Sequence, residues 1–369
     1  MTRPATSPAE IDRRYALVRE AMAGHGLDAV LVAGSEYTGF EGAVTYMSGF
    51  EIVHRYAYVL LPREGEPTIV FPAEARYVGE HGTSWIEDHV FADRPGAWLA
   101  DHLHGKRVGV YGLDYVFTVR DFEAAQHAAE LVPFDVEFDL ARAVKSDAEI
   151  ASVRDSVRIN TEGFWEFLEA YEPGKSAAAV LAPAERLFVT EGCGRLTMNM
   201  VLVGAEFALA RNDTILGEFC IPSLEIAGPG GHWVEVSRAL GEPNAEVSRM
   251  LEAYEDYFEA AEAGLRAGAT AHDVHRAVSK GFTDRGYHLG HVTGHSIGMT
   301  MIEHPKIGEG VDVELRENMV FSMHPHVIAD NGTDCLYMQD TWLVTEAGGE
   351  PLAGLPMRIY AAGESRPAA

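Results

Sequence analysis

The chain has 369 residues, 47% of them hydrophobic and 23% charged, so it can bury a large core and is not intrinsically disordered. Its 29 Lys and Arg against 56 Asp and Glu give a net charge of −27, which disfavours nucleic acid and anionic membranes as partners. The longest apolar stretches, such as residues 28–34 and 56–61, are far shorter than the roughly 20 residues that cross a bilayer. The N-terminus also lacks the apolar run of a secretion signal, so we expect a cytoplasmic protein.

The three cysteines are scattered along the chain and form no CxxC pair. An odd, scattered set is typical of a reducing compartment, and we interpret these side chains as buried thiols. They are Cys193, Cys220 and Cys335.

The first elements predict an α/β domain over residues 1–142. Ser7 and Glu10 form a capping-box pattern around Pro8, and apolar residues follow at helical spacing up to Met22. A run of strand-like segments follows this helix, with helical patterns between them. The predicted strands cover residues 28–33, 55–61, 68–71 and 107–111.

A second capping box, Ser146 to Glu149, opens a helix that ends before Pro173, and we place the domain boundary just before it. Residues 143–369 then mix helices and strands in an α+β order, without an internal repeat. The predicted helices cover residues 176–190, 244–267 and 271–285, and the predicted strands 198–204, 218–227, 232–240, 318–323 and 336–345.

Histidines concentrate in one part of this second domain. Histidine is the commonest metal ligand and titrates near neutral pH, so its density is a useful guide to chemistry. Six of the 16 histidines lie in a short stretch that is rich in glycine and proline, which favours a functional site over isolated core or surface histidines. They are His288, His291, His295, His304, His324 and His326.

Two glutamates flank a predicted turn at residues 229–231. A ten-residue separation across such a turn lets Glu225 and Glu235 point to one face of a hairpin. Paired acids on one face are metal ligands or an acid/base couple, unless the hairpin is exposed and the glutamates are solvated. His232 and Trp233 lie between them and are candidates for lining a substrate pocket, although a Trp on a hairpin is also typical of a core.

The order of these motifs resembles the creatinase, aminopeptidase P and prolidase family. The resemblance rests on the paired acids, a Gly-His-x-Ile-Gly loop at 294–298, an acid and proline at 303–305, a strand at 319–325 and a strand end at 344–348. Residues 142–150 resemble the family's entry into its second, "pita-bread" domain. The resemblance implies an α/β N-terminal domain followed by an α+β pita-bread catalytic domain, and Glu225 lies in a context similar to that of ectoine hydrolases.

The family's metallopeptidases hold two divalent metals with two Asp, one His and two Glu. The resemblance places five residues of this chain at those positions, of which only the histidine is unchanged. Two glutamates with neutral His and Gln carry −2, which balances one divalent ion or none, so we expect no dinuclear centre and no resident metal. The five residues are Glu225, Glu235, His295, His324 and Gln339.

Two further residues take candidate roles from the resemblance. The family carries a histidine in a His-Glu-x-Pro sequence, whereas this chain has His304 two positions later, next to Pro305. Arg55 falls where creatinase-like members use an arginine to hold a substrate carboxylate across a dimer interface, which implies a homodimer. The planar guanidinium is suited to a bidentate grip on a carboxylate.

These residues lead to the hypothesis of a hydrolase acting on a C–N bond of a small carboxylate-bearing nitrogen compound, such as an amidino, cyclic-amidine or amide compound. Glu225 or His324 would serve as the base, and Glu235 would hold a cationic substrate nitrogen. His295 and His326 would protonate the leaving amine, with His304 as a further catalytic candidate. Gln339, Arg55, His232 and Trp233 are the candidate substrate-binding residues.

Two alternatives remain open. A single Zn, Mn or Fe ion held by Glu225, Glu235, His295 and His324 would give an Xaa-Pro peptidase-like hydrolase or a lyase. A non-catalytic, protein-binding relative of the family would also show altered motifs, although the retained histidines favour an enzyme.

Overall fold

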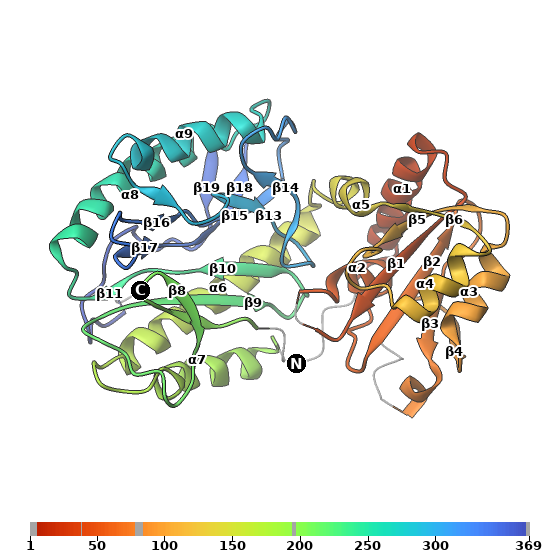
Figure 1. The fold of residues 1–369 in the computed structure, drawn as a ribbon, viewed down its shortest axis with the longest axis horizontal. Helices are drawn as coiled ribbons and strands as arrows, with labels where there is room; N and C mark the ends of the chain where they lie inside the picture. Colours follow the sequence, from red (N-terminus) through yellow and green to blue (C-terminus); the bar gives the residue numbers. More distant parts are fainter. Residues whose placement is uncertain (1–5, 38, 78–83, 194–196, 367–369) are drawn as a thin grey trace. The chain divides into compact units, whose positions relative to one another are not determined.

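The computed structural model describes residues 6–37, 39–77, 84–193 and 197–366. The chain divides into two compact units, each with its own sheet system (Figure 1). The N-terminal unit contains residues 4–142 together with 299–304, and the C-terminal unit contains residues 143–298 and 305–369. A boundary drawn in the sequence after residue 142 therefore leaves out a short segment that belongs with the N-terminal unit.

The N-terminal unit is built on a mixed sheet with strand order β4-β3-β2-β1-β5-β6. Its first helix begins where the capping pattern predicts, because the Ser7 side chain accepts a hydrogen bond from the Glu10 N–H. The strands are β1 (Ala29–Ser35), β2 (Tyr56–Pro62), β3 (Thr68–Pro72), β4 (Asp88–Ala92), β5 (Arg107–Tyr111) and β6 (Glu130–Pro133). The helices are α1 (Pro8–Gly24), α2 (Gly42–Ser48), η1 (Ala73–Tyr77), α3 (Pro95–Leu103), α4 (Val119–Gln126) and α5 (Asp135–Ala141).

Helices cover both faces of this sheet, which explains the continuous apolar sequence of β1. Val30 and Val32 pack in the cluster that includes side chains of α1 and α2. Leu31 lies on the opposite face, in the cluster with Leu99 and Leu103 of α3. Alternate residues of one strand thus enter two different cores, as is usual for a sheet between two helical layers.

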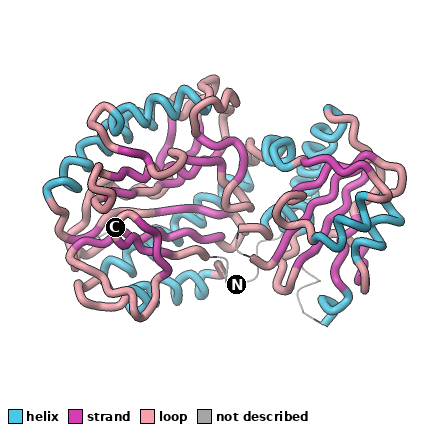
Figure 2. The backbone as a smooth tube through the Cα atoms, in the orientation of Figure 1, coloured by secondary structure: helices cyan, strands magenta, loops and turns pink. Residues whose placement is uncertain are grey.

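The C-terminal unit contains three sheets enclosed by four helices, with the strands between α8 and α9 on one side and α6 and α7 on the other (Figure 2). The sheet orders are β10-β9-β7-β8 with β11 beside β9, β12-β16-β17, and β14-β13-β15-β18-β19. The helices are α6 (Asp147–Ala170), α7 (Ala177–Glu191), α8 (Ala245–Gly264) and α9 (Ala271–Thr283). The strands are β7 (Met200–Val203), β8 (Glu206–Leu209), β9 (Phe219–Ala227), β10 (Trp233–Val236), β11 (Leu240–Gly241), β12 (His288–Leu289), β13 (Gly294–Ser296), β14 (Glu303–Ile307), β15 (Val320–Met323), β16 (His326–Ile328), β17 (Cys335–Tyr337), β18 (Asp340–Val344) and β19 (Gly349–Pro351).

The predicted start of α6 is confirmed: Ser146 and Glu149 form a complete, reciprocal capping box. The core beneath α8 and α9 buries the rings of Tyr254, Tyr257 and Phe282. All three cysteines are buried and free, as predicted, and burial raises the pKa of each thiol to about 12. In the described ranges, no helix is long and apolar enough to span a membrane.

A buried ion cluster ties residues 299–304 into the N-terminal unit. Arg142 lies 2.7 Å from Asp139 and 3.1 Å from Glu303, and it also donates a hydrogen bond of 2.8 Å to Thr300. All of these side chains are almost completely excluded from solvent. Gly42 allows the segment to approach, because a Cβ atom there would lie only 1.9 Å from the carbonyl oxygen of Met299.

This cluster predicts a strong dependence of stability on Arg142. Replacing it in Arg142→Leu leaves Asp139 and Glu303 buried without their cation, so we expect the free energy of unfolding to fall by about 3–5 kcal/mol. Urea unfolding followed by circular dichroism measures the change.

The matched control is Arg154→Ala, which breaks an exposed pair with Glu350 at 2.8 Å. Such exposed pairs contribute about 1 kcal/mol or less. Equal losses in the two variants would contradict the assignment of Arg142 as the buried counter-charge.

Candidate metal centre

The β9–β10 hairpin places the two predicted glutamates opposite each other. Glu225 pairs in register with Glu235 across the antiparallel strands, and both side chains are buried rather than solvated. The glycine-rich turn fits closely against α6, because a Cβ atom at Gly228 would lie 2.1 Å from the Ser156 hydroxyl. Asn160 of α6 donates hydrogen bonds to the carbonyls of residues 224 and 234, so the helix holds the backbone beside each glutamate.

His295 reaches the same space from β13. Its Nδ1 lies 3.0 Å from the carbonyl oxygen of Ser296, which places the proton on Nδ1 and leaves the Nε2 lone pair for a ligand. Nε2 lies 3.5 Å from Glu235 Oε1. A backbone contact of this kind is how proteins orient a metal-ligating imidazole.

His324 completes a group of three potential ligands. It follows β15, and its backbone N–H donates to the carbonyl of Thr293. Its ring centroid lies 4.9 Å from that of His295, and ligand atoms of Glu235, His295 and His324 all lie within 4.8 Å of one another. Nδ1 of His324 is buried without a hydrogen-bond partner among the described residues. One carboxylate and two imidazoles are a donor set suited to Zn, Mn or Fe(II).

Gln339 lies between the two glutamates. Its amide nitrogen donates to Glu235 Oε2 at 2.8 Å and to Glu225 Oε1 at 3.2 Å. Two hydroxyls add to this network, since Ser223 donates to Glu225 at 2.9 Å and Ser322 donates to Glu235. Every one of these side chains is buried, so the carboxylates are satisfied by protein groups rather than by bulk water.

The electrostatics of this pocket favour a cation. Burial, together with the charge of the neighbouring Glu235, raises the pKa of Glu225 to about 8. Burial also raises the pKa of Glu235 to about 7. Burial lowers the pKa of His324 well below its usual value, and the neighbouring His295 and His291 act in the same direction. A divalent cation bound by Glu235, His295 and His324 would reverse the shifts of the carboxylates and reinforce that of His324, because it stabilises ionised carboxylates and neutral imidazoles.

Histidines and aromatic rings form an outer wall beside His324. His291 lies 5.0 Å from His324 and 5.4 Å from His326, measured between ring centroids. Phe207 packs 5.4 Å from His326, and Tyr337 lies 6.1 Å from His324. Nε2 of His326 is buried without a hydrogen-bond partner in the described ranges. The structure therefore brings together the candidates Glu225, Glu235, His295, His324, His326 and Gln339.

Sequence reasoning counted His291 in the histidine-rich stretch but did not make it a site residue. Its proximity to His324 depends on the pairing of β12 with β16, which a histidine count does not reveal. Ser223 and Ser322 were missed altogether. The alternation of side chains along a strand could have identified them, because residues two positions apart share a face. Ser223 lies two positions before Glu225, and Ser322 lies two positions before His324.

Two predicted substrate-binding residues, His232 and Trp233, are buried at the start of β10. His232 contacts α6, with Nδ1 2.9 Å from the Ser152 hydroxyl and Nε2 3.7 Å from Glu149. Trp233 is fully buried in the core. Side chains alternate along β10, so Trp233 and Glu235 share one face while His232 stands at the start of the strand, against the helix.

His304 and Arg55 both belong to the N-terminal unit. The backbone N–H of His304 donates to Asp139 at 3.0 Å. Arg55 is exposed, has a left-handed backbone with φ of 60°, and pairs with Glu74 at 3.1 Å. The role of Arg55 at a substrate carboxylate and the homodimer stay predictions.

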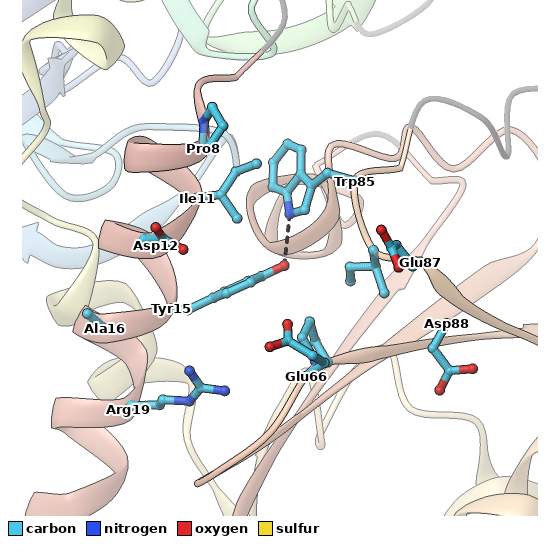
Figure 3. Close-up of a pocket in the computed structure, with 12 residues that line it drawn as sticks. Pro8, Ile11, Asp12, Tyr15, Ala16, Arg19, Glu66, Trp85, Glu87 and Asp88 are labelled. Atoms are coloured by element: carbon cyan, nitrogen blue, oxygen red, sulfur yellow. Dashed lines mark hydrogen bonds between the residues drawn. The ribbon is translucent and has the colours of Figure 1, made fainter.

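A cavity of about 730 Å³ lies in the N-terminal unit, between α1 and the segment before β4 (Figure 3). Tyr15 and Trp85 line it, and the Trp85 indole N–H donates to the Tyr15 hydroxyl at 2.8 Å. Acidic side chains such as Glu66 surround these rings. None of its described lining residues is a histidine, so size alone does not make this cavity the chemical site.

The chain matches two family models. "Metallopeptidase family M24" covers residues 151–346, and "Creatinase/Prolidase N-terminal domain" covers residues 14–144. The predicted fold class, an α/β N-terminal domain followed by an α+β pita-bread domain, is therefore confirmed.

Curated and solved relatives agree with this match. A "Probable dipeptidase PepE" of Mycobacterium tuberculosis is 26% identical over 374 residues, covering 94% of this chain and 95% of the relative. The solved dipeptidase PepE of Mycobacterium ulcerans is 22% identical, with a TM-score of 0.81 over 97% of this chain and 100% of that chain. The prolidase of Pyrococcus horikoshii OT3 is 21% identical, with a TM-score of 0.77 over 93% and 98% of the two chains.

These findings correct one expectation. The sequence led us to expect no resident metal, because only one family ligand is unchanged. That expectation is wrong: the family model is of a metallopeptidase, and Glu235, His295 and His324 converge as a metal-ligand set. Neutral imidazoles bind divalent cations without contributing negative charge, so a count of carboxylates underestimates what this site can hold.

The convergence of three donors predicts that metal binding depends on His324. We expect His324→Phe to lose stoichiometric divalent metal, because it removes one of three ligand side chains while filling the same space. Elemental analysis of purified protein measures the metal content, with His288→Ala as the control, since His288 is exposed and pairs with Asp330. Full retention of metal by a folded His324→Phe protein would remove this residue from the ligand set.

Proposed function

This chain belongs to metallopeptidase family M24, and from that premise we propose that it is a metal-dependent hydrolase that cleaves the peptide bond of a short peptide. One observation carries the proposal: three buried ligand side chains converge on one point at the edge of a hydrogen-bonded carboxylate pair. The names of the curated relatives, probable dipeptidase and Xaa-Pro dipeptidase, support a dipeptide as substrate.

Glu235, His295 and His324 are the residues that would hold a single divalent cation. Such a cation supplies Lewis-acid chemistry to amide hydrolysis. Ser322 and Gln339 orient the Glu235 carboxylate by hydrogen bonds to Oε2, which leaves Oε1 facing His295. This arrangement corresponds to the outer hydrogen bonds that position ligands at metal sites generally.

Glu225 is the proposed proton-transfer group. Its hydrogen bonds within the described ranges come from Ser223 and Gln339 and both end on Oε1, so Oε2 is available to water or substrate. The backbone N–H of Glu225 donates to the side-chain oxygen of Asn199 at 3.2 Å, which fixes the backbone at this residue. A carboxyl group held in this way can take a proton from attacking water and return it to the leaving amine.

The outer wall supplies the proposed substrate contacts. The buried Nε2 of His326 is available for a hydrogen bond to a peptide carbonyl or carboxylate, and Phe207 provides an apolar surface beside it. His295 becomes a metal ligand in this proposal instead of a proton donor. Arg55 of a second subunit remains the candidate for the substrate carboxylate.

The first hypothesis, hydrolysis of an amidino, cyclic-amidine or other non-peptide C–N bond, fits the same pocket but finds less support among the relatives. Hydrolysis of such compounds by the purified protein would support an activity similar to that of creatinase and ectoine hydrolases. A panel of substrates therefore distinguishes peptide-bond hydrolysis from hydrolysis of a non-peptide C–N bond.

We expect the purified protein to hydrolyse short peptides, Xaa-Pro dipeptides among them, and to lose this activity on treatment with a chelator. Readdition of Mn or Zn restores turnover, because the ligands are neutral or carboxylate groups that rebind the ion. Amine release from a panel of Xaa-Pro dipeptides, other dipeptides, N-acyl amino acids and amidino compounds is the measurement. Chelator-resistant turnover of amidino compounds alone would reject the peptidase proposal, and metal binding without any hydrolysis would favour the non-catalytic alternative.

A second expectation concerns Glu225. Glu225→Gln retains the hydrogen-bonding shape but cannot transfer a proton, so we expect kcat to fall by about 10²–10⁴-fold. Metal content stays unchanged, which separates this variant from the ligand variant His324→Phe. Glu346→Gln, at an exposed position, is the control. A fully active Glu225→Gln enzyme would exclude the proposed role.

A further inference from the structure

The Gln339 amide occupies the space between two buried carboxylates. The single nitrogen Nε2 donates to both Glu235 and Glu225, at 2.8 and 3.2 Å, so one positively polarised group bridges the pair. A bridging position between two carboxylates is where a divalent cation with oxygen ligands would otherwise lie.

The orientation of this amide is set by its surroundings. The nitrogen end of the amide faces the two glutamates, which accept from it, and the oxygen end lies 3.0 Å from the Ser223 hydroxyl. The backbone of Gln339 is paired with Ser237 in both directions, at 3.1 and 3.2 Å. The buried Arg238 also donates to the Gln339 carbonyl, and it forms an ion pair with Asp340.

We propose that the Gln339 amide replaces a second cation between Glu225 and Glu235, so that this chain holds one divalent ion per site instead of two. The inference rests on the proposed function, because it concerns the same site. Gln339 has no exposed surface and lies within hydrogen-bonding distance of both acids, so it leaves no room for an ion between them. The amide provides polarised hydrogens without a net charge, which satisfies two acceptors but brings no Lewis acid.

A carboxylate at position 339 should favour a cation between the two glutamates instead of excluding it. Gln339→Glu has nearly the same shape, but it replaces the N–H donor with an oxygen that faces two other carboxylates. Three carboxylates at hydrogen-bonding separations repel one another, and a divalent cation with oxygen ligands removes that repulsion. The variant should therefore create a second metal site from Glu225, Glu235 and residue 339.

The decisive quantity is the number of Mn ions bound per chain, measured by equilibrium dialysis and elemental analysis. We expect Gln339→Glu to bind one ion more than the wild type, whereas Gln339→Met, which has neither donor nor carboxylate, gains none. A wild type that binds two ions at this site overturns the inference. So does a folded Gln339→Glu protein with an unchanged count.

Electron paramagnetic resonance on the wild type keeps the test valid if Gln339→Glu does not fold. Two ions that share a carboxylate lie about 3.5–4 Å apart, which couples two Mn(II) spins. We expect the Mn-saturated wild type to give the signal of isolated Mn(II), and a spin-coupled spectrum would overturn the inference.

The outcomes separate this inference from the proposed function. Loss of the proposed function shows as wild-type protein without metal-dependent peptide hydrolysis. The inference about Gln339 is judged on the additional ion in Gln339→Glu, and on the isolated signal of the wild type. A wild type that binds no metal would reject the single-metal site, and with it the statement that this chain holds one ion per site.

Discussion

Two carboxylates buried on facing positions of one hairpin repel each other unless positively polarised groups lie between and around them. Glu225 and Glu235 impose this requirement on every element near them. Ser223 of β9 donates a hydrogen bond to Glu225, and Ser322 of β15 donates one to Glu235. Gln339, the residue before β18, also donates to Glu235. The two imidazoles of His295 and His324 then leave one side of Glu235 for a cation. The geometry of the whole pocket follows from satisfying these two acids.

Groups that perform no chemistry hold the segments that do. Tyr254 of α8 donates to the carbonyl of Pro325, between His324 and His326, and accepts from the backbone N–H of residue 338. Asn160 of α6 holds both strands of the glutamate hairpin. Each of these side chains reaches from a helix to the backbone of a strand or of a segment between strands, so the helices position the site as well as covering the core.

The sequence could predict features whose causes are local. The capping box at Ser146 and the hairpin around residues 229–231 depend on short stretches of chain, and both have the expected form. The arrangement of Gln339 could not be predicted, because its contacts join strands more than 100 residues apart. Metal binding was misjudged for a related reason: the charges could be counted from the sequence, but the convergence of His295 and His324 on Glu235 depends on tertiary pairing.

The membership of residues 299–304 in the N-terminal unit bears on the order in which the chain folds. During synthesis, residues 6–141 emerge well before Glu303, which supplies one of the two acids around Arg142. Until then the surface at Gly42 that receives Met299 is uncovered, and Arg142 has Asp139 alone. The N-terminal unit therefore completes its core only after most of the second domain has been translated, so an isolated fragment ending at residue 142 lacks part of its own interior.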